Sequence, residues 1–410
     1  MMRIFLAAVM AALAGGLSAS AVTAQKFEGL ALTPPMGWNS WNHYACNIDE
    51  KLIRATADAM AANGMRGAGY QYINIDDCWH GARDKDGWIQ SDPERFPSGI
   101  KALADYVHGK GLKLGIYSDA GTKTCAGRPG SQGYEYQDAL QYARWGVDYI
   151  KYDWCNTGTG ADQRNPREAY RTMRDAIRAS GRPMILSICE WGDGKPWEWG
   201  KDLGHLWRTT GDIINCWDCT VSHGTWISSG ILPILDKQTA MRVANGPDHW
   251  NDPDMMEVGN LPTLGENRAH FTMWAMLAAP LIVGTDIVGL KPDIRNILTD
   301  KDVIAVNQDS MGTQGFPWIK GSEVEIWAKP LTGKGWAIAV LNRSDRAQPV
   351  IIDWARYDLK DDLVGRQGQF DKIRYDVRNL WTKASTGDTS APLKLTIGPR
   401  DAAIYRLTPR

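Results

Sequence analysis

The sequence predicts a (β/α)₈ barrel followed by a small antiparallel β-sandwich. From residue 36 to about residue 290, short apolar strand-like runs alternate with amphipathic helical patterns in eight strand–helix units. A closed barrel of this type usually has about 250 residues, which matches this stretch. After residue 315 the pattern changes to alternating polar and apolar residues between Gly, Pro and Asp turns, which is typical of short antiparallel strands. We therefore expect the barrel over residues 25–314 and the sandwich over residues 315–410.

The eight expected barrel strands are apolar runs with polar or aromatic residues at their ends. They cover residues 36–41, 70–76, 112–118, 147–154, 184–189, 206–210, 281–284 and, more weakly, 249–255. Between them, Asp49 can cap a helix that Gly64 can end, and further helical patterns run to Gly109 and to Gly146. A doubly wound open sheet is the alternative, but it would carry a Gly-rich phosphate loop after its first strand, and residues 37–41 do not form one.

The expected sandwich strands are shorter and alternate in polarity. They cover residues 323–327, 336–341, 350–354, 373–377, 393–397 and 403–407. The sequence has no internal repeat beyond the strand–helix alternation and no low-complexity linker.

Residues 1–24 have the composition of a secretory signal. Arg3 precedes an apolar run over residues 4–17, and Val22, Thr23 and Ala24 form a small-residue cleavage site. The run is too short to span a bilayer, so we expect export to the periplasm or the extracellular space. The net charge of −1 favours neither nucleic acid nor a membrane surface as a partner, and the sequence carries no signal for an oligomeric state.

Seven cysteines in an exported chain indicate disulfides with one cysteine left over. Spacing alone does not assign the pairs. Cys216 and Cys219 could close a tight structural ring or act as a redox pair. We favour the ring, because no second dithiol and no thioredoxin-like pattern accompanies them.

Acidic side chains recur where the expected barrel strands end. Lys151 and Asp153 end one strand, and Arg208 with Asp212 follows another nearly sixty residues later. In such a barrel, side chains at the C-terminal ends of the strands line the active site. A glycoside hydrolase uses two acidic residues for catalysis, and two acids on separate strands fit this requirement. The other strand ends carry Trp41, Asp76, Asp77, Tyr117, Asp119, Glu190, Trp191, Asp252 and Asp254. Tryptophans near these acids, namely Trp79, Trp154 and Trp191, fit stacking against the apolar faces of sugars.

The acid cluster has two alternative interpretations, a metal site and a non-catalytic sugar-binding site. None of the seven histidines has metal-ligand spacing, although Asp76 and Asp77 could contribute to an all-carboxylate Mg²⁺ or Ca²⁺ site. We expect no metal and no other cofactor. A non-catalytic carbohydrate-binding protein is the second alternative, and the presence of both acids favours catalysis over it.

The chain resembles the α-galactosidases (melibiases) of glycoside hydrolase family 27 from Leu30 to the C-terminus. The motifs that carry the resemblance are TPPMGWNSW at 33–41, IDDCW at 75–79, DPERFP at 92–97, GIY at 115–117, KYD at 151–153, CEW at 189–191, RTTGD at 208–212 and WNDPDM at 250–255. Together these motifs are highly specific.

The resemblance implies a retaining double displacement. Asp153 would be the nucleophile, with Lys151 favouring its ionised form, and Asp212 would be the general acid and base. Asp76 and Asp77 would hold O4 and O6 of galactose. Lys151 would also reach ring hydroxyls, Glu190 and Arg208 the 2-hydroxyl, and Trp41, Tyr117, Trp191, Asp254 and Met255 would complete the pocket. The resemblance further implies disulfides Cys46–Cys78 and Cys125–Cys155, with Cys189 unpaired.

Glu190 separates this chain from close relatives. Enzymes that accept N-acetylgalactosamine have a small serine there, whereas a glutamate would fill the space of the acetamide and bond the 2-hydroxyl. The Asp76–Asp77 pair fits a sugar with a C6 hydroxyl, which disfavours the alternative of a β-L-arabinopyranosidase. The expected substrates are therefore oligosaccharides or polysaccharide side chains that end in α-linked D-galactose.

Overall fold

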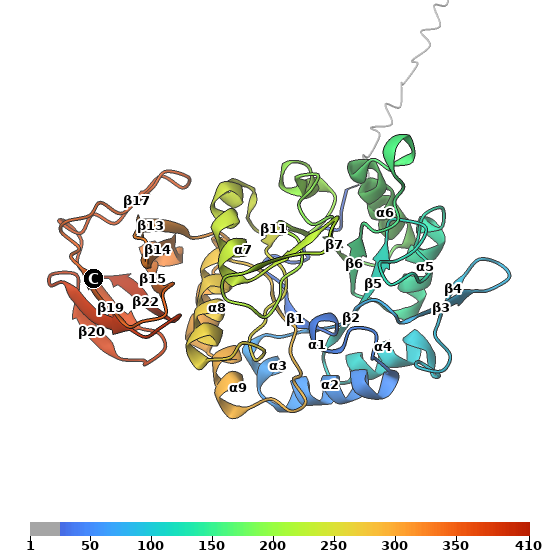
Figure 1. The fold of residues 1–410 in the computed structure, drawn as a ribbon, viewed down its shortest axis with the longest axis horizontal. Coiled ribbons are helices and arrows are strands. Elements are labelled where there is room, and N and C mark those ends of the chain that lie inside the picture. Colours follow the sequence, from blue (N-terminus) through green and yellow to red (C-terminus); the bar gives the residue numbers. More distant parts are fainter. Residues whose placement is uncertain (1–24) are drawn as a thin grey trace, which may run out of the picture.

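The computed structural model describes residues 25–410, and the expected signal segment 1–24 lies outside the described residues. A larger body of mixed strands and helices lies beside a smaller body made of strands (Figure 1). The larger body is the barrel and the smaller one is the sandwich. The fold class predicted from the sequence is confirmed.

The barrel sheet consists of parallel strands that form a nearly complete ring. The strands are β1 (Met36–Asn39), β2 (Tyr72–Ile75), β5 (Lys113–Asp119), β6 (Tyr149–Asp153), β7 (Ile185–Ile188), β8 (Leu206–Arg208), β11 (Trp250–Asp252) and β12 (Leu281–Val283). Their order is β11-β8-β7-β6-β5-β2-β1-β12. A parallel bridge between Met256, just after β11, and Val283 of β12 closes the ring. Each strand lies within or close to its expected range.

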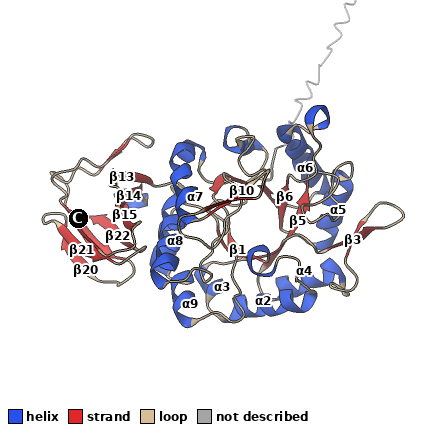
Figure 2. Cartoon of the chain, viewed as in Figure 1, coloured by secondary structure: helices blue, strands red, loops and turns tan. Residues whose placement is uncertain are grey.

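Helices surround this sheet and cover its outer face (Figure 2). They are α1 (Trp41–Tyr44), α2 (Glu50–Ala62), α3 (Met65–Ala68), α4 (Gly99–Gly109), α5 (Glu135–Trp145), α6 (Pro166–Ser180), α7 (Ile231–Gln238), α8 (Leu264–Leu277), α9 (Pro292–Leu298) and α10 (Lys301–Asn307). Short 3₁₀ turns lie at Gly160–Asp162, Pro196–Glu198, Gly200–Asp202, Thr239–Ala244 and Thr332–Lys334. As expected, Asp49 caps α2 by accepting a hydrogen bond of 2.7 Å from Leu52 N.

The tryptophans serve mainly the core. Trp38, Trp79, Trp207, Trp250, Trp274, Trp327, Trp336 and Trp354 are among the largest fully buried side chains. The expectation that Trp79 stacks against substrate is wrong. Its indole is buried and donates a hydrogen bond of 2.9 Å to Tyr117 O, because Cys78 before it adopts a left-handed φ of 77° that turns the chain inward.

Two hairpins were not expected from the sequence. Strands β3 (His80–Arg83) and β4 (Ile89–Ser91) follow β2, and β9 (Thr220–Ser222) and β10 (Ile227–Ser229) follow β8. Both hairpins therefore extend loops at the C-terminal end of the barrel sheet, which is the end where side chains line an active site in this fold.

The sandwich consists of one six-stranded sheet and shorter pairs. The six-stranded sheet has the order β13 (Phe316–Lys320), β14 (Val324–Pro330), β15 (Trp336–Asn342), β22 (Ala402–Pro409), β19 (Tyr375–Asn379), β20 (Ser385–Asp388). The pairs are β16 (Gln348–Ile352) with β21 (Leu393–Ile397) and β17 (Lys360–Asp361) with β18 (Arg366–Gln367). A separate hydrophobic cluster fills the space between them.

A buried lysine joins the sandwich to the barrel. Lys329 on β14 donates hydrogen bonds of 3.0 Å to Ala275 O in α8 and 2.6 Å to Val306 O in α10. Both acceptors lie in the last turn of a helix, where a positive charge is favourable. Burial nevertheless lowers the pKa of Lys329 to about 7. Packing of the sandwich on the barrel thus depends on a polar contact as well as on apolar area.

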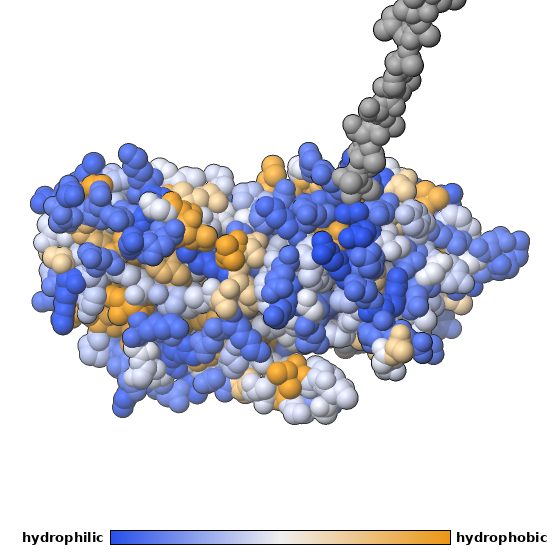
Figure 3. All heavy atoms as spheres, turned by 90° about the horizontal axis from the view of Figure 1, so that it is seen from above, coloured by the Kyte–Doolittle hydropathy of each residue, from blue (hydrophilic) through white to orange (hydrophobic). Residues whose placement is uncertain are grey.

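The outer surface is mixed in character. The face seen in Figure 3 shows small, separate hydrophobic patches among hydrophilic residues. Within residues 25–410, no helix has both the length and the apolar composition needed to cross a bilayer.

Candidate active site

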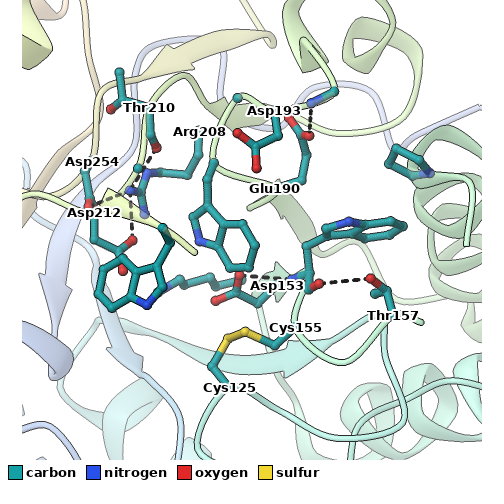
Figure 4. Close-up of a pocket in the computed structure, with 18 of the residues that line it drawn as sticks. Cys125, Asp153, Cys155, Thr157, Glu190, Asp193, Arg208, Thr210, Asp212 and Asp254 are labelled. Carbon is teal, nitrogen blue, oxygen red and sulfur yellow. Dashed lines mark hydrogen bonds and ion pairs between the residues drawn. A yellow bond between two sulfur atoms is a disulfide. The ribbon is translucent and has the colours of Figure 1, made fainter. Parts of the chain in front are cut away.

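A cavity of about 1370 Å³ opens at the C-terminal ends of the barrel strands. Its lining includes every residue to which the family resemblance gives a role in catalysis or substrate binding. These residues are Trp41, Asp76, Asp77, Tyr117, Lys151, Asp153, Glu190, Trp191, Arg208, Asp212, Asp254 and Met255. They come from many different strands, as the barrel topology requires. Figure 4 labels five of them, Asp153, Glu190, Arg208, Asp212 and Asp254.

Asp153 and Lys151 lie on the same face of β6, because they are two residues apart on a strand. Asp153 is 5% exposed, and its Oδ1 accepts a hydrogen bond of 3.0 Å from Trp154 N. Burial raises the pKa of the Asp153 carboxyl above its usual range, while Lys151 lowers it and Asp212 raises it further. Lys151 therefore acts in the expected direction, but burial has the larger effect on this pKa.

Arg208 connects two other acids of the cavity. Its Nη2 lies 3.1 Å from Asp212 Oδ1 and 2.8 Å from Asp254 Oδ2. Figure 4 shows both carboxylates directed toward the guanidinium. The side chain of Asp212 is 41% exposed, whereas those of Arg208 and Asp254 are 3% and 6% exposed. Asp212 is thus the acid of this cluster that water reaches most readily.

Asp76 and Asp77 lie just after β2, where backbone and side-chain donors fix their carboxylates. Asp76 Oδ2 accepts hydrogen bonds of 2.7 Å from Asn39 Nδ2 and 2.9 Å from Lys151 Nζ. Asp77 Oδ2 accepts one of 2.9 Å from Ala126 N, in the loop after β5. The two acids are therefore held in place before any substrate binds.

Disulfides fasten the loops around the cavity. The pairs implied by the resemblance are both joined, with Cα–Cα distances of 5.3 Å for Cys46–Cys78 and 5.1 Å for Cys125–Cys155. Cys216 and Cys219 form a third disulfide, and of the cysteines in residues 25–410 only Cys189 is free, and it is buried. Cys125 and Cys155 also line the cavity, beside Asp153 (Figure 4).

Glu190 is buried and only partly hydrogen-bonded. One carboxyl oxygen accepts a hydrogen bond from Gly194 N, and Oε1 has no partner among the described residues. Burial raises the pKa of Glu190 to about 8. A neutral carboxyl at Glu190 therefore predominates below about pH 8. Its unpartnered oxygen still leaves a site for a hydroxyl of a ligand.

Two strand-end acids predicted to face the pocket do not line it. Asp119 at the end of β5 and Asp252 at the end of β11 are buried, and both carboxyls accept backbone hydrogen bonds instead. The sequence suggested a shared role for all strand-end acids, but the loops after these two strands fold back and supply the donors.

The sequence reasoning missed much of the cavity rim. The β9–β10 hairpin contributes Gly224, Thr225, Trp226 and Ile227 to the lining, and Lys237 lies there as well. A large aromatic residue after Gly224 and Thr225, fourteen residues beyond Asp212, was the signal that could have identified this rim.

A buried and an exposed acid at or after the ends of separate strands, in one cavity of a (β/α)₈ barrel, match the pair of carboxyls that glycoside hydrolases use. The family model described as Alpha galactosidase A matches residues 33–309, and that of the Alpha galactosidase C-terminal beta sandwich domain matches residues 321–407. The chain is 58% identical to Alpha-galactosidase A of Cellvibrio japonicus over 95% of both chains. The chain therefore belongs to the α-galactosidases of glycoside hydrolase family 27.

Solved structures agree with this assignment. The structure of an α-galactosidase from Saccharomyces cerevisiae with raffinose has a TM-score of 0.84 and 30% identity, covering 95% of this chain and 100% of that one. A family 27 β-L-arabinopyranosidase from Geobacillus stearothermophilus has a TM-score of 0.76 at 23% identity, covering 92% and 97%. At 23% identity this similarity shows only a shared fold. The more similar relatives are α-galactosidases, so the chain is assigned to them and not to the β-L-arabinopyranosidases.

Proposed function

We propose that the chain hydrolyses terminal α-linked D-galactose by double displacement, with Asp153 as nucleophile and Asp212 as general acid and base. The observation that carries this proposal is the contrast between the two acids within one cavity. Asp153 is buried beside a lysine, whereas Asp212 lies beside Arg208 and is open to water. Carboxyls in such different environments are suited to different roles in one reaction.

In the first step, a carboxylate oxygen of Asp153 forms a bond to the anomeric carbon. The bond from this carbon to the glycosidic oxygen breaks, and Asp212 gives that oxygen its proton. In the second step, Asp212 takes a proton from water. The water oxygen bonds to the anomeric carbon while the ester to Asp153 breaks, so that the product keeps the α configuration.

The remaining cavity residues would recognise galactose. We assign O4 and O6 to Asp76 and Asp77, ring hydroxyls to Lys151, and the 2-hydroxyl to Glu190 and Arg208. Trp41, Tyr117, Trp191, Asp254 and Met255 would complete the pocket. The fixed positions of Asp76 and Asp77 support this assignment, because prearranged acceptors cost little to order when a sugar binds.

The substrate class follows from the same residues. We propose galactosides that carry the C6 hydroxymethyl group, as oligosaccharides or as side chains of polysaccharides. The complex of the yeast relative with raffinose supports this class. We further propose that residues 1–24 direct export to the periplasm or extracellular space and are then removed, leaving a barrel over 25–314 and a sandwich over 315–410.

An assay of the purified chain on three aryl glycosides tests the function. p-Nitrophenyl α-galactoside should be hydrolysed far faster than the matching β-L-arabinopyranoside and α-N-acetylgalactosaminide. Comparable or faster turnover of the arabinopyranoside would favour that relative's activity. Absence of turnover on all three glycosides would instead favour a carbohydrate-binding protein without catalysis.

A further inference from the structure

The rim of the cavity next to Asp212 carries a large exposed aromatic side chain. Trp226 lies in the turn of the β9–β10 hairpin and is 50% exposed, whereas every other tryptophan of residues 25–410 is buried or half-buried. The hairpin turn lines the cavity, and Lys237 on α7 lines it as well. Exposing an indole to water is unfavourable, so an aromatic side chain at a pocket mouth is a candidate contact for a ligand.

The turn holds this indole in a defined position. The rings of Trp226 and His223 stack with centroids 3.9 Å apart and an interplanar angle of 16°. His223 is itself fixed, because its Nε2 lies 2.9 Å from Ser228 Oγ, and its backbone N donates a hydrogen bond of 2.9 Å to Trp226 O. An aromatic side chain held in this way loses little conformational entropy when it contacts a ligand.

The hairpin is also attached to the backbone of the proposed acid. Ser229 N donates a hydrogen bond of 2.9 Å to Asp212 O. A Cβ atom added at Gly211 would lie 2.5 Å from Ile227 O, so the hairpin packs directly on the residue before Asp212. The Cys216–Cys219 disulfide holds the base of this segment, where Gly230 N and Ile231 N bond the carbonyls of the two cysteines at 2.9 Å each.

The position of Trp226 relative to Asp212 indicates which part of the substrate it meets. Asp212 delivers its proton to the glycosidic oxygen, so groups on its solvent side face the leaving group rather than the galactose. The cavity volume of about 1370 Å³ exceeds the roughly 300–1,000 Å³ of most small-molecule sites, which leaves room beyond one hexose. A pyranose ring offers an apolar C–H face to an indole and hydroxyls to Lys237.

We propose that Trp226 forms a leaving-group subsite that binds a second pyranose ring. This inference rests on the proposed function. It identifies a residue that favours a sugar over a simple alcohol as the leaving group, and it gives the Cys216–Cys219 disulfide a role in holding that subsite.

Replacement of the indole tests the subsite through two substrates with chemically similar leaving groups. Melibiose releases glucose, a second pyranose, whereas methyl α-galactoside releases methanol, which has no ring to stack. For Trp226→Ala, kcat/KM on melibiose should fall roughly three- to tenfold, as expected for the loss of one aromatic contact. On methyl α-galactoside it should stay within about twofold, and Trp226→Phe should restore most of the melibiose activity.

Further arms separate the alternatives. Val221→Ala changes another exposed apolar residue of the hairpin, one that lies outside the cavity lining, and should leave both substrates unaffected. A galactosylated manno-oligosaccharide in place of melibiose shows whether glucose or mannose occupies the subsite. Equal loss on melibiose and methyl α-galactoside, or no loss on any disaccharide, would overturn the subsite. Absence of galactose release by the wild type would instead refute the proposed function.

Discussion

Asp119 and Asp153 lie opposite each other in the register of β5 and β6, so a second buried carboxyl stands beside the proposed nucleophile. Asp119 Oδ1 accepts a hydrogen bond of 2.7 Å from Gly121 N, and Oδ2 accepts one of 3.0 Å from Cys155 N. The carboxyl therefore ties together the loops that follow the two strands. Burial, reinforced by the charge of Asp153, raises the pKa of Asp119 well above its usual range.

Asp119→Asn should reduce the loss of stability that accompanies a rise in pH. A carboxyl with a raised folded-state pKa keeps its proton to higher pH than in the unfolded chain, so the stability it contributes is lost as pH rises from the unfolded to the folded pKa. An amide does not titrate, so this part of the decline should vanish. The variant should also be less stable overall by about 1–3 kcal/mol, because its amide accepts only one of the two backbone bonds.

Chemical denaturation at pH 5 and pH 8 measures both effects. The surface variant Asp105→Asn, whose carboxylate is 60% exposed, serves as the control and should change neither the stability nor its pH dependence appreciably. The unfolding free energy should fall more from pH 5 to pH 8 in the wild type than in Asp119→Asn. An equal fall in both proteins would show that Asp119 has the same pKa in the folded and unfolded states.

The barrel was predictable because its strands are buried and end at one edge. Ile73 and Ile75 in β2, and Leu114 and Ile116 in β5, are almost fully buried, which produces apolar runs that a sequence displays directly. The parallel order then brings the residues after each strand to one end. For this reason Asp76, Tyr117 and Asp153, which come from three different strands, line the same cavity.

The wrong predictions of pocket residues have a common physical cause. The conformation of the loop after a strand determines the direction of the residues at the end of that strand. Trp79 and Asp119 looked like pocket residues from their positions, but a left-handed turn at Cys78 and backbone donors after β5 direct them away from the cavity. All three residues of β9 are exposed, so the strand lacks the alternation of buried and exposed residues by which a sequence indicates a strand. Trp226 was missed for this reason.

Glu190→Ser should weaken the preference for galactosides over N-acetylgalactosaminides. In the proposed binding mode the wild-type side chain fills the space next to the 2-position. An acetamide there would clash with Glu190 and remove the hydrogen bond between Glu190 and the 2-hydroxyl, at a cost of a few kcal/mol. The smaller serine should relieve this clash while reducing galactoside turnover. The ratio of kcat/KM values on the two p-nitrophenyl glycosides measures the change.

Glu190→Gln is the matched control for the charge of this residue. Because burial raises the pKa of Glu190 to about 8, the neutral amide resembles the native side chain at pH 6. Its galactoside turnover and its preference should therefore stay close to wild type at that pH. A loss as large as that of Glu190→Ser would indicate that the ionised carboxylate recognises the 2-hydroxyl.

Asp212→Asn should separate substrates by their leaving groups. Removal of a general acid costs about 10²–10⁴ in rate when the leaving oxygen needs a proton, as it does in melibiose. A dinitrophenolate leaves without protonation, so the first step on dinitrophenyl α-galactoside should be nearly normal, with a burst of phenolate before slow turnover. Asp153→Asn should show neither burst nor turnover. A burst in Asp153→Asn and none in Asp212→Asn would reverse the two assignments.

The anomeric configuration of the first galactose released tests the central claim most directly. Proton NMR during the opening minutes of methyl α-galactoside hydrolysis distinguishes the α anomer from the β anomer before mutarotation mixes them. Attack by Asp153 followed by attack of water inverts the anomeric carbon twice, so α-galactose should appear first. Initial release of β-galactose would mean that water attacks directly, and it would contradict the assignment of Asp153 as the nucleophile.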